Sequence, residues 1–420
     1  MTARMCRQLL VFATLLLCLG GSTLASEDQP VTRIVNTKTL ERDVEPVIVR
    51  GASVDAFSGI PVNQLILYTY TGSTWLQIPA QVDEVTAGGS YALIEDGLLD
   101  ANDEIVFMAK DLGSQAPADS ALPAVLPIDL RWYEIEVSDP TSPAGKGWAY
   151  LVRSRVLDPT SPDDYVDFDP AAHRINGENY SLGFATPDPW ADYLTLGGSG
   201  VDILDRTKMR LACKVPFICP ITEEEGAELQ DDLVKDGPVR VIVRSGRVLA
   251  YGTVASWVTV IDIPELLAGD IRFSTDFSSM VSGAVYYNAA VPMGVTADGI
   301  PDAVAEEPLS PWWQLSTAAG TLVYAADTTP IGGTQSNYYV DDATVDASDT
   351  GDQRHYGDTG VSIQGPNLEF SYTFALYVLP GVQPNQGETY AAYLAQPLSV
   401  STQLMRLDLP LKLYLPRIHR

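Results

Sequence analysis

The sequence predicts an all-β protein, folded as an antiparallel β-sandwich or supersandwich with few short helices. Short runs of strand-forming residues recur between turn residues along the chain, whereas sustained helical periodicity is almost absent. Many short strands separated by turn clusters are typical of sandwiches and sandwich-like barrels. The N-terminus adds a third observation, because its pattern places this fold outside the cytoplasm.

The clearest strand signals come in pairs. Their apolar residues alternate with polar ones, and Gly, Pro, Ser or Thr residues interrupt them, as expected for hairpins. The predicted strands cover 65–70 and 75–78, 131–137 and 148–156 (joined by a loop over 139–147), 238–244 and 248–260, and 370–379. Two short helices are predicted, over 223–235 and 263–269.

The first 25 residues have the three parts of a secretory signal peptide. Two arginines precede an apolar run over 9–19, and small residues lead to a cleavage site after Ala25. The run is shorter than the roughly 20 residues that a bilayer-spanning helix needs. We therefore expect a cleaved signal peptide (1–25), an N-terminal extension (26–44), no membrane span, and a secreted or cell-surface protein.

A break in composition suggests two domains. Pro, Asp and Ser dominate the stretch from Leu157 to Pro170, which suits a linker or a long surface loop. The alternative is one large sheet system in which this stretch is merely a loop. The predicted organisation is a β domain over 45–157, a linker or long loop over 158–174, a larger β-sandwich domain over 175–400, and a C-terminal tail over 401–420.

The charge of the chain excludes one class of partner. Its formal net charge is −28, and it becomes −30 once the signal peptide and its two arginines are removed. So negative a protein repels nucleic acid and anionic lipid, and it favours solubility and cation binding. Nucleic-acid binding is therefore not expected.

Two cysteines remain after the signal peptide. Cys213 and Cys219 flank a proline-bent segment, with no second cysteine pair or nearby histidine to complete a zinc site. Their spacing is also not that of a C-x-x-C redox motif. In an oxidising compartment, such a pair is expected to form a local disulfide.

Acidic loops suggest a cation. Carboxylate and amide oxygens are the hard ligands that Ca²⁺ prefers, and a dense cluster of carboxylates repels itself unless it is solvated or shares a cation. The alternative is that these loops are solvated turns of an acidic protein. The candidate calcium ligands are Asp100, Asn102, Asp341, Asp342, Asp346 and Asp349.

A glycine-bent polar loop holds the best catalytic candidates. Proton transfer on a sugar needs a base, an acid and a cation against developing negative charge. Asp352, Arg354, His355 and Tyr356 supply all three kinds, and polysaccharide lyases often use similar sets. Glycoside hydrolysis, which needs two spaced carboxyls, is the other enzymatic reading. The alternative is that His355 is a surface residue hydrogen-bonded to its acidic neighbours.

Aromatic residues supply candidate binding surfaces. Flat amphipathic rings stack on sugars in water, although most aromatics in an all-β chain belong to the core. Three tryptophans next to prolines are predicted to be exposed and to bind ligand: Trp190, Trp312 and Trp313.

Two local resemblances add to this interpretation. The segment from Asp236 to Val243 resembles the strand entry of some carbohydrate-active proteins with a galactose-mutarotase-like supersandwich, which implies that fold and a glycan ligand. The last residues, around Tyr414 to Arg417, resemble C-terminal tails of some exported bacterial proteins, which implies retention or sorting at the surface.

Together these features predict a secreted, carbohydrate-associated β-sandwich protein that binds glycans or a cell-surface polymer, or cleaves a polysaccharide. The alternative is a non-catalytic cell-surface or matrix protein whose acidic loops are stabilised by Ca²⁺. Whether the protein is an enzyme is left open by the sequence.

Overall fold

The computed structural model describes residues 36–117, 120, 131–160, 163–184, 190–213, 219–225, 233–243, 247–263, 265–267 and 269–406. The predicted signal peptide lies outside the described residues, as does the tail from 407 onward. Among the described residues, no helix is long and apolar enough to cross a membrane.

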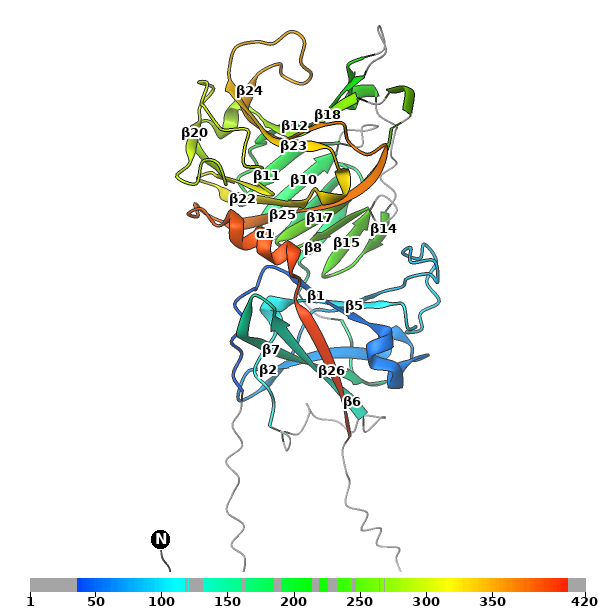
Figure 1. Cartoon of the computed structure of the whole chain (residues 1–420). Helices are drawn as coiled ribbons and strands as arrows, with labels where there is room; N and C mark the ends of the chain where they lie inside the picture. The colour runs from blue at the N-terminus through cyan, green and yellow to red at the C-terminus, as the bar shows by residue number, and fades with distance from the viewer. Residues whose placement is uncertain are drawn as a thin grey trace, which may run out of the picture. The chain divides into compact units, whose positions relative to one another are not determined.

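The described chain is built from antiparallel sheets, which confirms the all-β prediction (Figure 1). Two sheets come from the first part of the chain, with one strand added from its end. The three-stranded sheet has the order β1 (Pro46–Arg50), β5 (Glu104–Met108), β4 (Gln81–Asp83). The β6 sheet has the order β26 (Ser399–Arg406), β6 (Arg131–Asp139), β7 (Ser142–Arg153), β2 (Leu65–Tyr70), β3 (Trp75–Gln77).

Three further sheets come from the rest of the chain. The four-stranded sheet has the order β11 (Ala191–Leu196), β10 (Tyr180–Phe184), β9 (Arg174–Gly177), β8 (Val166–Asp169). The β12 sheet has the order β13 (Ile221–Thr222), β12 (Leu204–Cys213), β18 (Gly269–Phe277), β24 (His355–Gln364), β23 (Thr334–Asp342). The nine-stranded sheet has the order β14 (Leu233–Asp236), β15 (Arg240–Val243), β16 (Val248–Tyr251), β17 (Val254–Asp262), β25 (Glu369–Pro380), β22 (Gly320–Asp327), β21 (Trp312–Ser316), β19 (Ala284–Asn288), β20 (Val295–Ala297).

Most predicted hairpins are present with small changes at their ends, but the single strand predicted over 248–260 is wrong, because it turns back on itself as the antiparallel strands β16 and β17. β2 pairs with β3, and β6 pairs with β7 with a register shift between Ser138 and Asp139. The loop predicted over 139–147 is wrong, because β7 already begins at Ser142 and the connection is a tight turn. Pro, Gly and Ser there lie in an exposed hairpin end, where strand pairing continues despite their turn-forming preference.

Helices are fewer than predicted. The segment predicted over 223–235 forms a short 3₁₀ turn at Glu223–Glu225 and strand β14 at its other end, so the helix is wrong there. The second predicted helix is reduced to a 3₁₀ turn at Glu265–Leu267. The described residues contain one α-helix, α1 (Gly387–Ala395), which packs on β21, β22 and β25 and which the sequence did not predict (Figure 1).

The core confirms sheet-on-sheet packing. One apolar cluster joins the three-stranded sheet to the β6 sheet through residues such as Phe107 and Ile135. The β12 sheet packs on the nine-stranded sheet, since the rings of Phe277 and Trp313 meet edge to face at 5.8 Å. Residues on the inner faces alternate with polar ones on the outer faces, as expected for a sandwich.

Parts of the predicted linker and of the predicted C-terminal tail form β-strands. Part of the segment predicted as a linker forms β8, which pairs with β9. Part of the predicted tail forms β26, which runs antiparallel to β6 from Ser399 to Arg406. The domain boundaries themselves stay a prediction.

Candidate functional site

An apolar cavity of about 470 Å³ lies between the nine-stranded sheet and the β12 sheet. Its walls are made largely of aliphatic and aromatic side chains from both sheets. The nine-stranded sheet contributes Trp257, Ile261, Trp313, Leu322, Tyr324, Tyr372, Phe374 and Leu376, and the β12 sheet contributes Met209, Leu211, Ile271, Phe273 and Val361. Small-molecule sites are typically clefts of about 300–1,000 Å³ with this kind of lining.

A row of stacked aromatic rings, here called the aromatic ladder, forms one wall of the cavity. Trp313 stacks on Tyr324 at 5.2 Å, Tyr324 meets Phe374 at 5.2 Å, and Phe374 stacks on Trp257 at 5.0 Å. The four residues come from four adjacent strands, β21, β22, β25 and β17. Cross-strand neighbours on one face of a sheet lie close enough for such ring contacts.

The alternation within β25 explains how the ladder is placed. Phe370, Tyr372 and Phe374 point inward, while the residues between them, Ser371 and Thr373, are exposed. Because successive side chains of a strand point to opposite faces, three aromatic residues at every second position must share one face. The sequence of β25 alone therefore places its aromatic residues on one face. The strands that pair with β25 and complete the wall come from other parts of the chain.

Polar side chains are a minority of the cavity lining, and several of them already have partners. Thr207 donates to the carbonyl oxygen of Ala191 at 3.2 Å, and the hydroxyl of Thr359 bonds that of Tyr286 at 2.7 Å. Of the charged residues of the lining, Glu225 and Arg247 are exposed, whereas Lys208 is buried and paired with carboxylates. The cavity therefore offers a large apolar surface and little capacity for hydrogen bonding.

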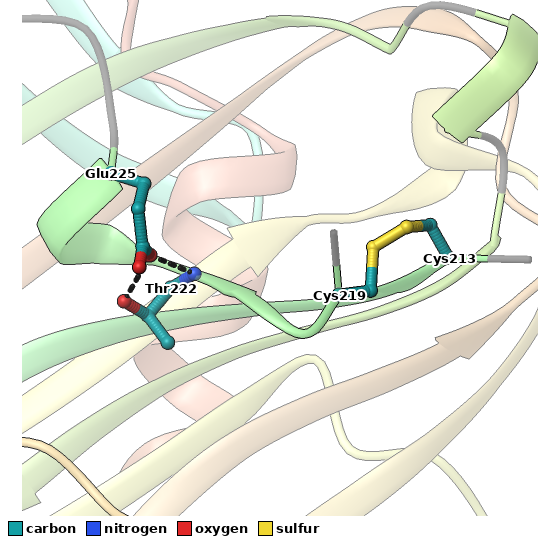
Figure 2. Close-up of a disulfide and its surroundings, with 4 residues drawn as sticks. All are labelled: Cys213, Cys219, Thr222 and Glu225. Carbon is teal, nitrogen blue, oxygen red and sulfur yellow. Dashed lines mark hydrogen bonds between the residues drawn. A yellow bond between two sulfur atoms is a disulfide. The ribbon is translucent and has the colours of Figure 1, made fainter. Parts of the chain in front are cut away.

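The predicted disulfide is confirmed and lies beside this cavity. Cys213 ends β12, and Cys219 precedes β13, so the bridge links β12 to the edge strand β13 beside it (Figure 2). Next to it, the backbone N–H and the hydroxyl of Thr222 both donate to Glu225, at 2.7 and 2.5 Å. Glu225 also lines the cavity. The disulfide therefore constrains an edge of the sandwich that borders the cavity.

The structure brings together two of the three tryptophans predicted to bind ligand. Trp190 and Trp313 line the cavity, whereas Trp312 packs elsewhere in the core. The expectation that the Trp312–Trp313 pair is exposed is wrong, because the two residues open β21 and are only 6 % and 5 % exposed. Gly387 at the start of α1 leaves no room for a side chain above the Trp312 ring, so the helix sits directly on it.

A second feature, the buried charge cluster, consists of Lys208, Asp276, Asp349, His355 and Asp358. Lys208 lies on β12, Asp276 on β18, and His355 with Asp358 on β24. Lys208, Asp276 and Asp358 are completely buried. In β18, Phe273 and Thr275 face the cavity, so Asp276 points to the opposite face of the sheet. The Asp276 carboxylate therefore faces away from the cavity, although Lys208 is also among the residues that line the cavity.

Lys208 is the permanent cation of the cluster. Its ammonium group bonds Asp276, and it lies 2.5 Å from a carboxylate oxygen of Asp349. Although burial opposes ionisation of Asp349, its contacts with Lys208 and Arg210 lower its pKa to about 2. Asp349 is therefore a charged partner for two cations at neutral pH.

His355 lies between two buried carboxylates. Its Nδ1 atom is 3.3 Å from Asp276 and 3.5 Å from Asp358. Interaction with these two groups raises the pKa of His355 to about 10, while burial and then the charge of Asp358 raise the pKa of Asp276 to about 7. Without another cation, the imidazole is therefore protonated at neutral pH and cannot accept a proton as a general base.

The acidic loop, defined as residues 343–354 between β23 and β24, is anchored to β12 beside this cluster. Arg210 donates to Asp349 at 2.6 Å, and the backbone N–H of Asp352 donates to Asp205 at 3.0 Å. Gly351 has a positive φ of 74°, and a Cβ atom there would lie 1.9 Å from the Asp205 carboxylate. The loop approaches the sheet so closely that only glycine fits at this position.

The four predicted catalytic residues occupy different surroundings. His355 alone belongs to the buried charge cluster. Asp352 and Arg354 are exposed, and the Asp352 carboxylate accepts a hydrogen bond from the backbone of Arg354 at 2.8 Å. Tyr356 packs against the apolar core. Their catalytic role stays a prediction.

The predicted calcium ligands mostly bond to nearby protein groups. Asp341 accepts from the backbone of Asp298 and Gly299, and Asp342 and Asp346 accept from residues two positions further on. Asp349 is paired with Lys208 and Arg210. In the other loop, Asp100 is exposed and Asn102 half-buried, and the backbone oxygen of Asn102 accepts from Arg50. Calcium binding therefore stays a prediction.

Sequence reasoning missed Lys208, Asp276 and Asp358 as a group. Within the part of the chain that the structure describes, Asp276, His355 and Asp358 are the residues whose metal-ligating atoms lie within 4.8 Å of one another. Polar residues at alternate positions of β12 and β18 were the available signal. Only the pairing of β12 with β18 and of β18 with β24 brings them together.

Comparison with protein-family models finds none that matches the chain, and comparison with curated proteins finds no significant match.

Proposed function

We propose that this protein is an exported binding protein that holds a small, predominantly apolar molecule in the cavity between the β12 sheet and the nine-stranded sheet. One observation carries the proposal: a cavity of about 470 Å³ with the aromatic ladder along one wall. The predicted signal peptide over residues 1–25 is the reason to place this activity outside the cytoplasm.

The size of the cavity supports an occupant. Empty apolar cavities cost about 24 cal/mol per Å³, which amounts to about 11 kcal/mol for 470 Å³. That is comparable with the total free energy of unfolding of a typical protein, about 5–15 kcal/mol. Because the cavity reaches solvent, water reduces this cost, but an apolar wall binds water poorly. An apolar ligand would remove the cost and gain burial energy.

The chemistry of the lining favours an apolar ligand over a glycan. A sugar presents many hydroxyls, and each one that loses water without a new partner costs free energy. The wall hydroxyls of Thr207 and Thr359 already bond other protein groups. A flat hydrophobic molecule instead matches the rings of Trp257, Phe374 and Tyr324. Carbohydrate association therefore stays a prediction that the cavity does not favour.

Dye binding tests the proposal with a matched pair of variants. Ala326 lines the cavity, whereas Thr373 lies exposed on the outer face of the neighbouring strand. Ala326→Phe adds a ring to the cavity, and Thr373→Phe adds the same group outside it. We expect the uncharged dye N-phenyl-1-naphthylamine to bind the wild type and Thr373→Phe alike, and Ala326→Phe at least about tenfold more weakly, a change of 1.4 kcal/mol.

Energy transfer makes the test independent of how well the variant folds. Trp190, Trp257 and Trp313 all line the cavity, so dye bound there must quench tryptophan emission in the wild type. Folded wild type that binds no dye, or equal dye binding by both variants, would contradict the proposal. Binding of soluble oligosaccharides without any apolar ligand would instead support the carbohydrate function predicted from the sequence.

A further inference from the structure

The side chains of Asp276, His355 and Asp358 leave ligand atoms unused inside the protein. Both oxygens of Asp358, one oxygen of Asp276 and the Nδ1 atom of His355 are buried and have no partner with hydrogen-bond geometry. Asp276 and Asp358 are 0 % exposed, and His355 is 8 % exposed. A buried ionised carboxylate is costly unless it is paired or coordinates a metal ion. Something beyond these side chains is needed to satisfy this group.

The spacing of these atoms fits a metal ion. A tetrahedral ion with bonds of about 2.0–2.1 Å separates its ligand atoms by roughly 3.3–3.4 Å. The Nδ1 atom of His355 lies 3.5 Å from an oxygen of Asp358, and 3.3 Å from the Asp276 oxygen that also bonds Lys208. These distances are long for strong hydrogen bonds to a charged imidazole, which are typically 2.7–2.9 Å. They match two ligand-to-ligand edges of such a site.

The charges around the group point in the same direction. The buried charge cluster contains three carboxylates, and Lys208 is its one permanent cation. Lys208 bonds Asp276 and Asp349, and the oxygens of Asp358 accept no hydrogen bond from it. A divalent cation that takes the place of the His355 proton would bring its own charge to Asp276 and Asp358, the two carboxylates that this imidazole lies beside.

We propose that Asp276, His355 and Asp358 bind a divalent transition-metal ion of the Zn²⁺ class. One imidazole nitrogen with two carboxylates suits Zn²⁺, whereas Ca²⁺ takes six to eight oxygen ligands. The ion would join β18 to β24 beside the anchored acidic loop. The site is separate from the calcium ligands predicted from the sequence, and it does not depend on the ligand-binding function proposed above.

Metal titration of the full chain tests the proposal. After treatment with a chelator, the folded protein is titrated with Zn²⁺ and with Co²⁺, whose visible absorption reports its coordination. His355→Gln and Asp358→Asn each remove one ligand, and Asp346→Asn is the matched control because Asp346 is an exposed carboxylate of the acidic loop. We expect one metal ion per chain for the wild type and the control. The two ligand variants should bind at least about 100-fold more weakly, the upper end of the loss for outer-shell partners.

A wild-type measurement keeps the test valid if a ligand variant fails to fold. Pulsed electron paramagnetic resonance of the Cu²⁺-loaded wild type should show coupling to an imidazole nitrogen. Folded wild type that binds no Zn²⁺ or Co²⁺, or a Cu²⁺ spectrum without that coupling, would overturn the proposal. Ca²⁺ binding that is lost in Asp346→Asn and kept in His355→Gln would overturn it too, and it would support the calcium site predicted from the sequence.

Discussion

The aromatic ladder makes a quantitative prediction for Phe374→Ala. The Phe374 ring contacts Trp257 at 5.0 Å, Tyr324 at 5.2 Å and Tyr372 at 5.9 Å. Replacing a core Phe by Ala typically costs about 3–5 kcal/mol of unfolding free energy, and each aromatic pair contributes about 0.5–1.5 kcal/mol of it beyond area burial. Phe374 borders an existing cavity, so we expect the lower end, about 3 kcal/mol.

Urea denaturation, followed by tryptophan fluorescence and by circular dichroism, measures this loss. The control is Thr373→Ala, one position away on the exposed face, where we expect a change within about 0.5 kcal/mol. Loss of ring contacts should also weaken dye binding about fivefold, which corresponds to about 1 kcal/mol. A Phe374→Ala protein as stable as the Thr373→Ala control would refute the claim that the ring contacts of Phe374 stabilise the cavity wall.

Two further predictions concern buried charges away from the cavity. Arg240, fully buried, pairs with Asp83 and Glu104. Arg240→Met leaves the buried carboxylate of Asp83 without a cation, while Glu104 keeps Arg50, and it should cost about 3–5 kcal/mol in denaturant unfolding. A loss below about 1 kcal/mol would contradict this. Burial raises the pKa of Asp111 to about 6, above its unfolded value, so its contribution to stability is greatest below pH 4 and is lost as the pH rises to about 6. Denaturant unfolding at several pH values should show this fall in the free energy of unfolding for the wild type and not for Asp111→Asn. The same fall in Asp111→Asn would assign the pH dependence to other groups.

The sequence predicted the fold because its main signal is local. The enrichment of 65–70 and 370–379 in strand-forming residues is a property of a few neighbouring residues, and those strands appear within about one residue of the predicted ends. The disulfide was equally local, since Cys213 and Cys219 are six positions apart. At the start of the helix predicted over 223–235 the chain instead forms a 3₁₀ turn, where Glu223 pairs with Arg210 of a neighbouring strand, a contact that propensity does not include; residues 226–232 lie outside the described residues.

Candidate sites were harder to predict because they depend on which strands pair. His355 was recognised as chemically important from its own loop. Its partner Asp358 is three positions along the same strand and was local, but Asp276 comes from strand β18, which no local pattern links to it. The three tryptophans were chosen for exposure, and Trp312 and Trp313 are buried because β21 lies inside a nine-stranded sheet.

Three properties follow from the sequence alone: strand-forming runs with apolar residues at every second position, a short-range disulfide, and a strong negative charge. Only the tertiary structure decided which side chains from different strands meet on each face of a sheet. Strand order brought four aromatic rings into one wall and three ligand atoms to one point. The reason is physical: alternation assigns a side chain to a face of its own strand, but the neighbours it meets there depend on pairing between distant segments.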